Sequence, residues 1–407
     1  MEQLNTRCCV VGGGPAGMML GYLLARAGVE VLVLEKHGDF LRDFRGDTIH
    51  PSTLDVLHEL GLLEKFLKRP HDEVRQLTGW IGDSHLRVAD FTHLPTHCKF
   101  IAFMPQWDFL TFFAEDAKRY PSFRLLMNTE ATDLLVEDGL VTGVWAKSGQ
   151  GQLAIRAGLT IAADGRHSIL RQRAGLEIID LGAPMDVLWM HISRADSDPP
   201  VTLGRVDAGR IVVLLNRRTY WQCALIIPKG AYDEFRARGL PAFQAQLARL
   251  APFLRDRVSE LANWDQIKLL TVMVDRLKRW WRPGLLCIGD AAHAMSPIGG
   301  VGINLAIQDA VAAANILAKP LQTRAADDHE LASVQRRREF PTRATQRMQI
   351  LIQNNVIKRV LRSSHIQAPL LLKLVDRWPL LQRIPARLVG VGFRPEHIKT
   401  PDIHSSS

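Results

Sequence analysis

The stretch CCVVGGGPAGMMLGYLLARAGVEVLVLE, residues 8–35, decides how this chain begins to fold. An apolar run ends at Val11, three glycines follow, and a helix-forming segment continues to Ala27, after which Gly28 supplies a helix stop. A second apolar run then leads directly into Glu35. This order of strand, glycine turn, helix and strand predicts a compact βαβ unit with parallel strands.

The glycine turn predicts a dinucleotide site. Gly12, Gly14 and Gly17 have the spacing GxGxxG, in which the first glycine permits the tight turn, the second lets the backbone approach a pyrophosphate and the third lets helix and strand pack closely. The free N–H groups of the helix N-terminus then face the phosphates. Glu35 ends the second strand, where its carboxylate can accept ribose hydroxyls and would repel a 2′-phosphate. The alternative, a glycine loop that only turns the chain, leaves Glu35 unexplained.

Composition narrows the class of protein. Hydrophobic residues make up 47% and charged residues 23% of 407 residues, which is typical of a soluble globular chain of one large or two intertwined domains. We expect a cytoplasmic protein without integral membrane association, because no apolar run reaches the roughly 18 residues of a membrane span and the N-terminus lacks a signal-peptide pattern. The five cysteines are odd in number and lie mostly in apolar runs, so they indicate buried free thiols.

The net charge of +9 belongs to the C-terminal part of the chain. Residues 336–402 contain 14 Lys/Arg and 4 Asp/Glu, so the rest is close to neutral. We find no basic patch with aromatic platforms and therefore expect no nucleic-acid partner. This basic, leucine-rich tail is predicted to be helical. A solvated helical face packing on the rest of the protein is the favoured interpretation, and contact with a membrane surface is the alternative.

Two further motifs occur in order along the chain. Ala163–Arg171 has the sequence ADGRHSILR, after strand-like runs at 131–137, 140–147 and 154–163. Gly289–Asn304 has the sequence GDAAHAMSPIGGVGIN, after a buried strand-like run, and it opens a long apolar helix. With the glycine turn, these motifs resemble the DG and GD signatures of the single-component FAD monooxygenases related to para-hydroxybenzoate hydroxylase. The resemblance runs from about residue 7 to about residue 320.

The resemblance implies an α/β fold. We expect a Rossmann-like FAD-binding domain with a parallel sheet and a β-meander, formed discontinuously by residues 1–75, 98–182 and 270–320. An antiparallel-sheet substrate domain, residues 76–97 and 183–269, is interleaved with it. Residues 321–407 form a C-terminal helical segment.

The resemblance also implies the chemistry. NADPH or NADH reduces FAD without a second GxGxxG domain, and reduced FAD reacts with O₂ to a C4a-hydroperoxide that hydroxylates an aromatic or polyketide-like small molecule. Alternatives on the same scaffold are an epoxidase, a dehydrogenase or a flavin-binding protein without turnover. The expected assembly is a monomer or homodimer. The residues expected to bind FAD are Gly12, Gly14, Pro15, Ala16, Gly17, Glu35, Lys36, Arg45, Gln106, Asp164, Gly165, Gly289, Asp290, Pro297, Gly300, Gly302, Ile303 and Asn304.

Each motif has a physical role. Asp290 follows a buried strand and is expected to reach a ribityl hydroxyl, with an ordinary helix N-cap as the alternative. The helix that begins at Gly302 directs its N-terminus at the flavin ring, where it would stabilise negative charge. Relatives often have proline in place of Ser296 and glutamine in place of Val301, which puts the geometry above the ring in doubt. Arg166 and Arg171 are candidate sites for nicotinamide-cofactor phosphates, or else surface arginines without a role.

The substrate side is less well defined by the sequence. No catalytic residue is assigned and no metal ligands are expected. If the substrate is a phenol, the candidate bases are His50, His191, Arg194 and Tyr220. The candidate pocket walls, with plain core packing as the alternative, are Trp189, Met190, Tyr220, Trp221 and Met273. Few charges occur in these strands, which favours a neutral or hydrophobic substrate.

Overall fold

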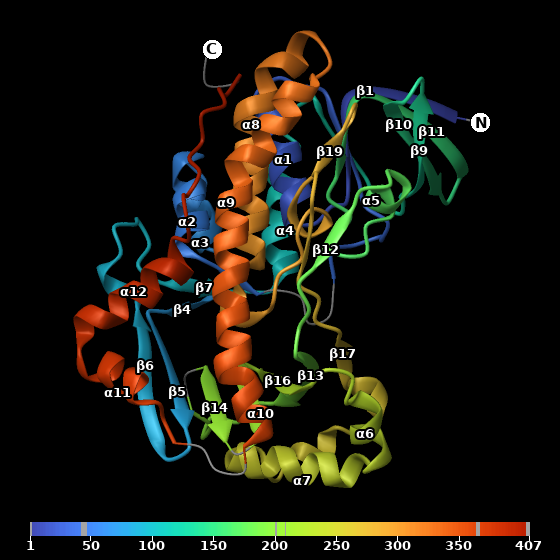
Figure 1. The fold of residues 1–407 in the computed structure, drawn as a ribbon. Helices are drawn as coiled ribbons and strands as arrows, with labels where there is room; N and C mark the ends of the chain where they lie inside the picture. Colours follow the sequence, from blue (N-terminus) through green and yellow to red (C-terminus); the bar gives the residue numbers. More distant parts are fainter. Residues whose placement is uncertain (1, 42–46, 200–201, 208, 364–366, 404–407) are drawn as a thin grey trace.

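The computed structural model describes residues 2–41, 47–199, 202–207, 209–363 and 367–403. It contains two large sheets joined by long helices, and the sheets occupy opposite ends of the molecule (Figure 1). The twelve α-helices of this part of the chain are α1 Pro15–Arg26, α2 Pro51–Glu59, α3 Leu63–Leu67, α4 Gln106–Ala117, α5 Ile169–Arg173, α6 Tyr232–Ala237, α7 Leu240–Leu250, α8 Gly302–Thr323, α9 Asp328–Ile352, α10 Lys358–Arg362, α11 Leu370–Arg377 and α12 Pro379–Gly390.

The first sheet has eight strands in the order β19-β20-β11-β1-β2-β8, with β10 pairing β11 and β9 pairing β10. Its members are β1 Glu2–Val11, β2 Val31–Leu34, β8 Phe123–Leu126, β9 Glu130–Glu137, β10 Leu140–Ser148, β11 Gly151–Ala162, β19 Trp281–Arg282 and β20 Leu285–Cys287. Strands β20, β11, β1, β2 and β8 run parallel, whereas β9, β10 and β11 form the predicted antiparallel meander. Because the central strands are apolar on both faces, helices cover them and their residues are buried.

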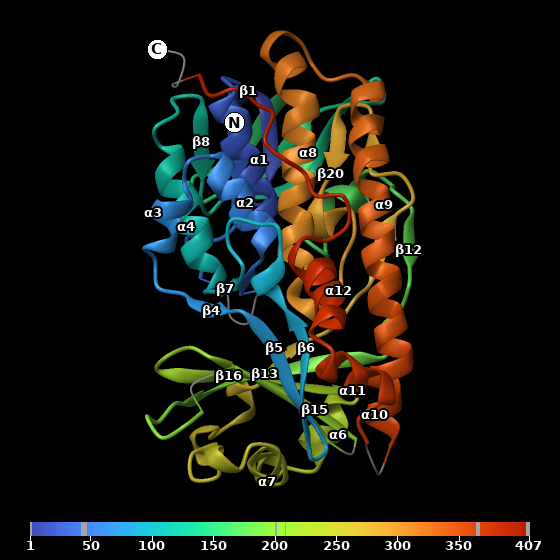
Figure 2. The ribbon, with the colours of Figure 1, turned by 90° about the vertical axis from the view of Figure 1, so that its left-hand side faces the viewer.

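The second sheet has seven strands in the order β17-β13-β16-β15-β14-β5-β6. Its members are β5 Gln76–Ile81, β6 Ser84–Asp90, β13 Met185–Ser193, β14 Leu203–Asp207, β15 Arg210–Asn216, β16 Tyr220–Pro228 and β17 Lys268–Leu270. Pairing is antiparallel except between β14 and β5. In Figure 2, β5 and β6 descend from the upper part into this lower sheet. Two small sheets complete the list: β3 Thr48–Ile49, β4 Asp72–Val74 and β7 Ile101–Phe103, and β12 Ile178–Asp180 with β18 Asp275–Leu277.

The buried apolar residues form two main clusters and two smaller ones among the described residues. A large cluster surrounds the parallel strands, α1 and α8, and a separate cluster lies between one face of the antiparallel sheet and α7. Helix α9 extends from the parallel sheet to the antiparallel sheet (Figure 1). Ile298–Thr323 passes the length and hydropathy test for a membrane span, but 83% of its window is buried inside the protein. This segment, which consists of α8 and the turn before it, is therefore a core helix of the protein.

The mixed α/β fold, with a parallel sheet, a meander, an antiparallel sheet and C-terminal helices, confirms the predicted class. Pro341 and Pro385 lie inside α9 and α12, so the tail helices continue through prolines that the sequence pattern would place at breaks. All five cysteines are buried free thiols, as expected. Burial raises the pKa of the Cys98 thiol to about 11, which disfavours the reactive thiolate.

Candidate functional site

The three motifs meet at one edge of the parallel sheet. Strands β1, β11 and β20 are parallel neighbours, so their carboxyl ends lie together. The N–H of Ala163 donates to the carbonyl of Val11 at 2.8 Å, and the N–H of Ile288 donates to Ala162 at 3.0 Å. A Cβ added to Gly12 would overlap the carbonyl of Ala163. The glycine turn, the DG motif and the GD motif therefore form one contiguous surface, as in sheets that bind ligands beyond their strand ends.

The glycine turn has the geometry that a phosphate site requires. Gly12 has a φ of +110°, and a Cβ on Gly17 would overlap the carbonyl of Gly12, so both positions need glycine. Gly14 differs, because a Cβ there would meet no atom within 4 Å. Helix α1 begins after Gly14 with Pro15 at its first position and has no side-chain cap. Its N–H groups are thus left for a ligand, and the space beside Gly14 is open to one.

Glu35 lies against this turn. Its Oε2 accepts the N–H of Gly13 at 3.1 Å and its Oε1 accepts the N–H of His37 at 3.0 Å, while the residue is only 8% exposed. The carboxylate therefore has a fixed orientation, and a carboxylate can accept further hydrogen bonds. Lys36 follows at the surface.

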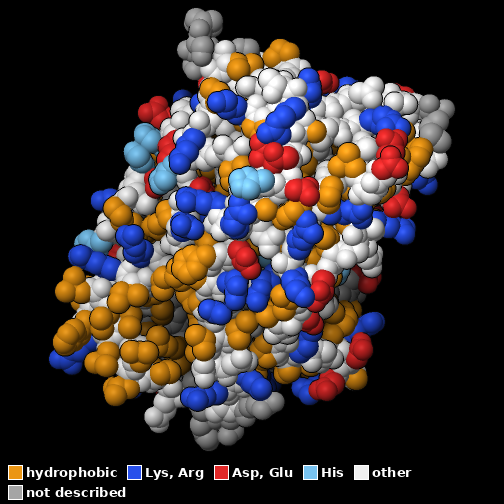
Figure 3. Space-filling model, turned by 45° about the horizontal axis from the view of Figure 1, so that its top comes forward, with side chains coloured by type: hydrophobic (Ala, Val, Ile, Leu, Met, Phe, Trp, Pro, Cys, Tyr) orange, Lys and Arg blue, Asp and Glu red, His pale blue; other side chains and the backbone are white. Residues whose placement is uncertain are grey.

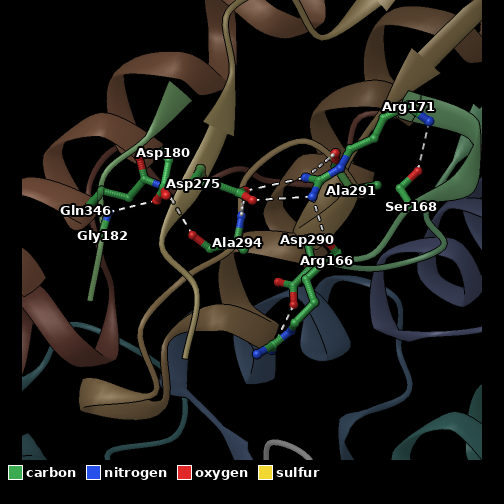
Figure 4. Close-up of polar contacts among 10 residues, drawn as sticks. All are labelled: Arg166, Ser168, Arg171, Asp180, Gly182, Asp275, Asp290, Ala291, Ala294 and Gln346. Carbon is green, nitrogen blue, oxygen red and sulfur yellow. Dashed lines mark hydrogen bonds and ion pairs between the residues drawn. The ribbon is translucent and has the colours of Figure 1, made fainter. Parts of the chain in front are cut away.

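Figure 4 shows how the DG and GD motifs are joined. Arg166 Nη2 lies 3.1 Å from Asp290 Oδ2, and both side chains are partly exposed. Arg171 is buried, and it contacts both Asp275 carboxylate oxygens and the carbonyl of Ala291. Arg171 is therefore unavailable to the phosphates of a nicotinamide cofactor, and it is not a free surface arginine either. It ties the helix after the DG motif to the segment around the GD motif.

A buried charge network supports the GD turn from behind. Asp309, on α8, accepts the N–H of Gly289 at 3.1 Å, contacts His293 Nε2 at 2.6 Å and accepts Arg338 Nε at 3.0 Å. Burial raises the pKa of Asp309, but His293 and Arg338 together outweigh it and hold that pKa below its usual value. No local sequence motif predicts this network. The available signal was a single acidic residue within the apolar run of α8.

The Pro297–Gly302 loop is held from two sides. Thr48 Oγ1 donates to the carbonyl of Gly300 at 3.0 Å. On the other side, the N–H of Ser296 donates to Gln349 Oε1 at 3.2 Å, and Gln353 Nε2 donates to Ser296 Oγ at 2.7 Å. A proline at position 296 would lack the backbone N–H that donates to Gln349. Ser296, which stands where relatives often have proline, is therefore held by hydrogen bonds to two glutamines. Gln349 lies in α9 and Gln353 in the turn after it.

Several buried polar atoms beside this surface lack a hydrogen-bond partner among the described residues. They include Asp164 Oδ1, in the DG motif, and Asn304 Nδ2, in the first turn of α8. Asn304 Oδ1 already accepts Thr53 Oγ1 at 2.6 Å. Buried polar groups are normally paired, so an acceptor and a donor remain to be satisfied by a ligand. Together with the open space at Gly14, this fits a dinucleotide that extends from the glycine turn to α8.

One face of the antiparallel sheet carries a group of polar residues among apolar ones. Asp47, just before β3, lies 2.5 Å from Arg217 Nη2 and accepts Gln222 Nε2 at 2.8 Å. His191 pairs opposite Gln222, and Tyr220 is two residues from it, so all three share a face. The rings of His191 and Tyr220 are 4.6 Å apart. Burial raises the pKa of Asp47, and Arg217 counteracts this.

The proposed pocket walls divide between the two faces. Trp189 packs on the face opposite α7, beside Val213. Met190 and Trp221 instead lie in the core under α7, because neighbouring strand residues point to opposite faces. For Met190 and Trp221 the structure therefore supports core packing, which was the alternative to a pocket wall. Met273 is half-buried and belongs to none of the core clusters.

The other candidates fall into different environments. His50 is fully buried, its Nδ1 lies 2.8 Å from the carbonyl of Val389, and burial lowers its pKa to about 4. Arg194 stacks on Trp221 at 5.9 Å, at the sheet's edge. Gln106 begins α4 and is half-buried, whereas Arg45 lies outside the described residues. Within the described ranges, no group of three His, Cys, Asp or Glu residues is arranged to hold a metal ion.

Comparison with known proteins places the chain in a family. Residues 5–348 match the model of the FAD binding domain family. The chain is 32% identical over 393 residues to 6-methylpretetramide 4-monooxygenase from Streptomyces rimosus, covering 94% of this chain and 92% of that protein. It is 25% identical over 352 residues to para-nitrophenol 4-monooxygenase from a Pseudomonas strain, covering 81% and 82%. Rifampicin monooxygenase from Streptomyces venezuelae is 26% identical over 307 residues. The match covers 74% of this chain and 61% of that longer enzyme.

Solved structures have the same fold. The p-nitrophenol 4-monooxygenase of Pseudomonas putida superposes with a TM-score of 0.75 at 20% identity, covering 95% of this chain and 97% of that chain. With the family model matched across most of the chain, the cofactor is FAD, and NAD(P)H is the typical electron donor of such enzymes. This chain therefore belongs to the FAD binding domain family and is an FAD-dependent monooxygenase.

Proposed function

We propose that this enzyme hydroxylates a polycyclic phenolic, polyketide-like small molecule, bound between the face of the antiparallel sheet that carries His191 and the Pro297–Gly302 loop. The observation that carries the proposal is the similarity to 6-methylpretetramide 4-monooxygenase, which extends over 94% of the chain and therefore includes this sheet and the tail. The aromatic and polar residues of this face, half-buried Trp189 and Tyr220 with the more exposed His191, suit an extended ring system that carries hydroxyl groups.

Individual residues have separate roles in binding FAD. Gly12, Gly14, Pro15, Ala16 and Gly17 hold the pyrophosphate, and Glu35 with Lys36 lies at the adenosine ribose. Asp290, oriented by Arg166, reaches the ribityl chain. Two further sets complete the site: Asp164, Gly165 and Gln106 border the flavin, and Pro297, Gly300, Gly302, Ile303 and Asn304 lie at the ring's edge. Arg45, outside the described residues, stays a prediction from the resemblance to the family. Support comes from the open space at Gly14 and from the unpaired buried atoms of Asp164 and Asn304.

When bound, FAD supplies the redox chemistry, since it accepts a hydride from NAD(P)H and activates O₂ for oxygen transfer to the substrate. The protein contributes position and electrostatics. The N-terminus of α8 directs its positive end at the ring edge, which favours negative charge there. Tyr220 holds a substrate hydroxyl by hydrogen bonding, and His191 receives its proton. The buried contacts among Asp47, Arg217 and Gln222 fix the position of the antiparallel sheet relative to the segment before β3.

The test uses purified enzyme loaded with FAD. Oxidation of NADPH and of NADH, uptake of O₂ and products are followed with an aromatic tetracyclic polyketide, a single-ring phenol and an aromatic carboxylate that lacks a hydroxyl. The expected result is stimulated oxidation with the tetracycle and incorporation of one atom of isotopically labelled O₂ into it. Hydrogen peroxide formation without labelled product, for every compound, contradicts the proposal. A clear preference for the carboxylate contradicts the substrate class alone.

A further inference from the structure

Helices α11 and α12 are turned with their apolar sides outward. Leu370, Leu371, Trp378, Leu380 and Ile384 are each more than half exposed, and Leu370 is 74% exposed. Figure 3 shows hydrophobic side chains gathered on the lower left of the molecule, where Figure 1 places α11 and α12. A contiguous apolar patch of this kind on a water-soluble surface marks an interaction site.

The inward sides of the same helices are polar or small, which fixes this orientation. Asp376 accepts the backbone N–H of Arg87, on β6, at 2.8 Å. Gln382 is buried and donates to the carbonyls of Val375 and Asp376, which ties α12 to α11. Ala386 is fully buried against the body of the protein. Because these contacts use the polar side, the leucines cannot turn inward without breaking them.

The charge around the patch identifies its partner. Residues 353–394 contain eight Lys/Arg and one Asp/Glu, and that acid, Asp376, points to β6. Lys373, Arg377 and Arg383 are exposed on the same two helices. Lys and Arg side chains that flank Leu and Trp on a surface helix are the arrangement that lies flat on an anionic bilayer.

A second copy of the chain fits this surface poorly. A two-fold interface places the same patch of both copies against each other, which would bring the two sets of basic residues together with one carboxylate each. Juxtaposed like charges oppose such a contact. A negatively charged lipid surface has the complementary charge and an apolar interior for the leucines.

We propose that α11 and α12 form a peripheral membrane-binding surface that lies in the headgroup region of an anionic phospholipid bilayer, without a spanning segment. Leu370, Leu371, Trp378, Leu380 and Ile384 enter the acyl boundary, while Lys373, Arg377 and Arg383 contact lipid phosphates. Binding then depends on both apolar contact and charge, and salt weakens it.

The test measures partition of the full-length FAD-loaded protein by vesicle flotation, with phosphatidylcholine vesicles that contain or lack phosphatidylglycerol. Wild type is expected to float with the anionic vesicles at low salt and to be released at high salt. The triple variant Leu370→Ser/Leu371→Ser/Leu380→Ser is expected to lose at least about tenfold in partition. Lys373→Glu/Arg377→Glu is expected to do the same. All variants should retain bound flavin, which shows that they are folded.

A matched control is Val136→Ser/Leu140→Ser, because these exposed residues lie on β9 and β10, at the opposite end of the molecule (Figure 1). Its partition should equal that of wild type. The proposal is overturned by no partition into anionic vesicles, by equal partition into neutral vesicles, or by equal loss in the control. It is also overturned if the leucine variants instead convert a dimer to a monomer in sedimentation velocity, since the patch then binds a second copy.

Discussion

The carboxylate of Asp309 accepts the backbone N–H of Gly289 at 3.1 Å. A residue in the core helix α8 thereby fixes the turn from which Asp290 projects toward the cofactor surface. The same carboxylate is paired with His293 and Arg338, and all three side chains are buried. Arg338 belongs to α9, so the C-terminal segment contributes directly to the shape of the flavin side.

Removing the Asp309 carboxylate should lower the free energy of unfolding of the protein. Asp309→Ala removes the nearer of the two carboxylates that Arg338 contacts and leaves Glu396 at 3.5 Å. The loss should therefore be at most the roughly 3–5 kcal/mol of unfolding free energy that breaking a buried ion pair typically costs. Urea denaturation of wild type and variant measures the difference. Glu177→Ala removes an exposed partner of Lys278 and should leave the midpoint close to that of wild type. Equal midpoints for Asp309→Ala and wild type would show that the network does not stabilise the fold.

Gly14 distinguishes ligand contact from folding. Gly14→Ala places a methyl group where the protein has no atom within 4 Å, at an ordinary φ of −75°. Stability without cofactor should therefore be unchanged, whereas FAD affinity should fall by about tenfold or more because the methyl group occupies the approach to the pyrophosphate. Calorimetric titration of deflavinated protein measures the affinity.

Gly149→Ala is the matched control, because it also meets open space but lies in the β10–β11 turn. It should bind FAD as wild type does. Full FAD affinity in Gly14→Ala would place the pyrophosphate elsewhere.

The substitution Asp290→Ala is expected to reduce FAD binding more than folding stability. Its ion pair with Arg166 is partly exposed, so Asp290→Ala should cost about 1 kcal/mol of stability or less. Loss of the 450 nm flavin band, roughly where flavins absorb, should nonetheless accompany the variant on purification. Arg166→Ala, which leaves the carboxylate in place, should retain more flavin. Unchanged flavin content in Asp290→Ala refutes its assigned role.

Stability should fall as the solution is acidified through the range set by His50. Burial lowers its folded pKa to about 4, below an ordinary value near 6.5. Between these values the unfolded chain binds a proton that the folded protein does not, so lowering the pH from about 6.5 to 4 costs up to about 3 kcal/mol. Below the folded pKa both states are protonated and this contribution levels off. Urea midpoints of wild type and His50→Gln across this range measure it, and an identical pH dependence for both would exclude His50 as the cause.

His191 and Tyr220 should affect turnover and leave flavin content unchanged. His191→Gln retains a hydrogen-bonding group but removes an imidazole that can take a proton near neutral pH, so kcat should fall by about 10²-fold for a phenolic substrate. Tyr220→Phe keeps the ring contact and should mainly raise KM. Steady-state kinetics across pH separate the two effects. An unchanged kcat and pH profile in His191→Gln would remove it from the mechanism.

The order of strands and helices in the parallel half of the fold could be predicted from the amino-acid sequence. A glycine turn between an apolar strand and a helix, with Glu35 at the end of the next strand, is a local pattern whose geometry depends on neighbours in the chain. The buried strand before Gly289 and the long helix after Gly302 were equally readable from apolar runs. These features follow from backbone sterics and periodicity, which act over a few residues.

Contacts between side chains that are distant in the sequence could not be predicted in this way, because they depend on how the elements pack. Pairing of Asp309 with Arg338, of Asp47 with Arg217 and of Ser296 with Gln349 depends on contacts between elements that local pattern does not specify. Local pattern also does not specify which face of the sheet a strand residue points to, since a shift of one residue in the pairing reverses the face. Met190 and Trp221 point to the face that packs against α7 and are therefore core residues. The outward leucines of α11 and α12 were visible in the sequence, but their exposure depended on Gln382 and Asp376 taking the inward side.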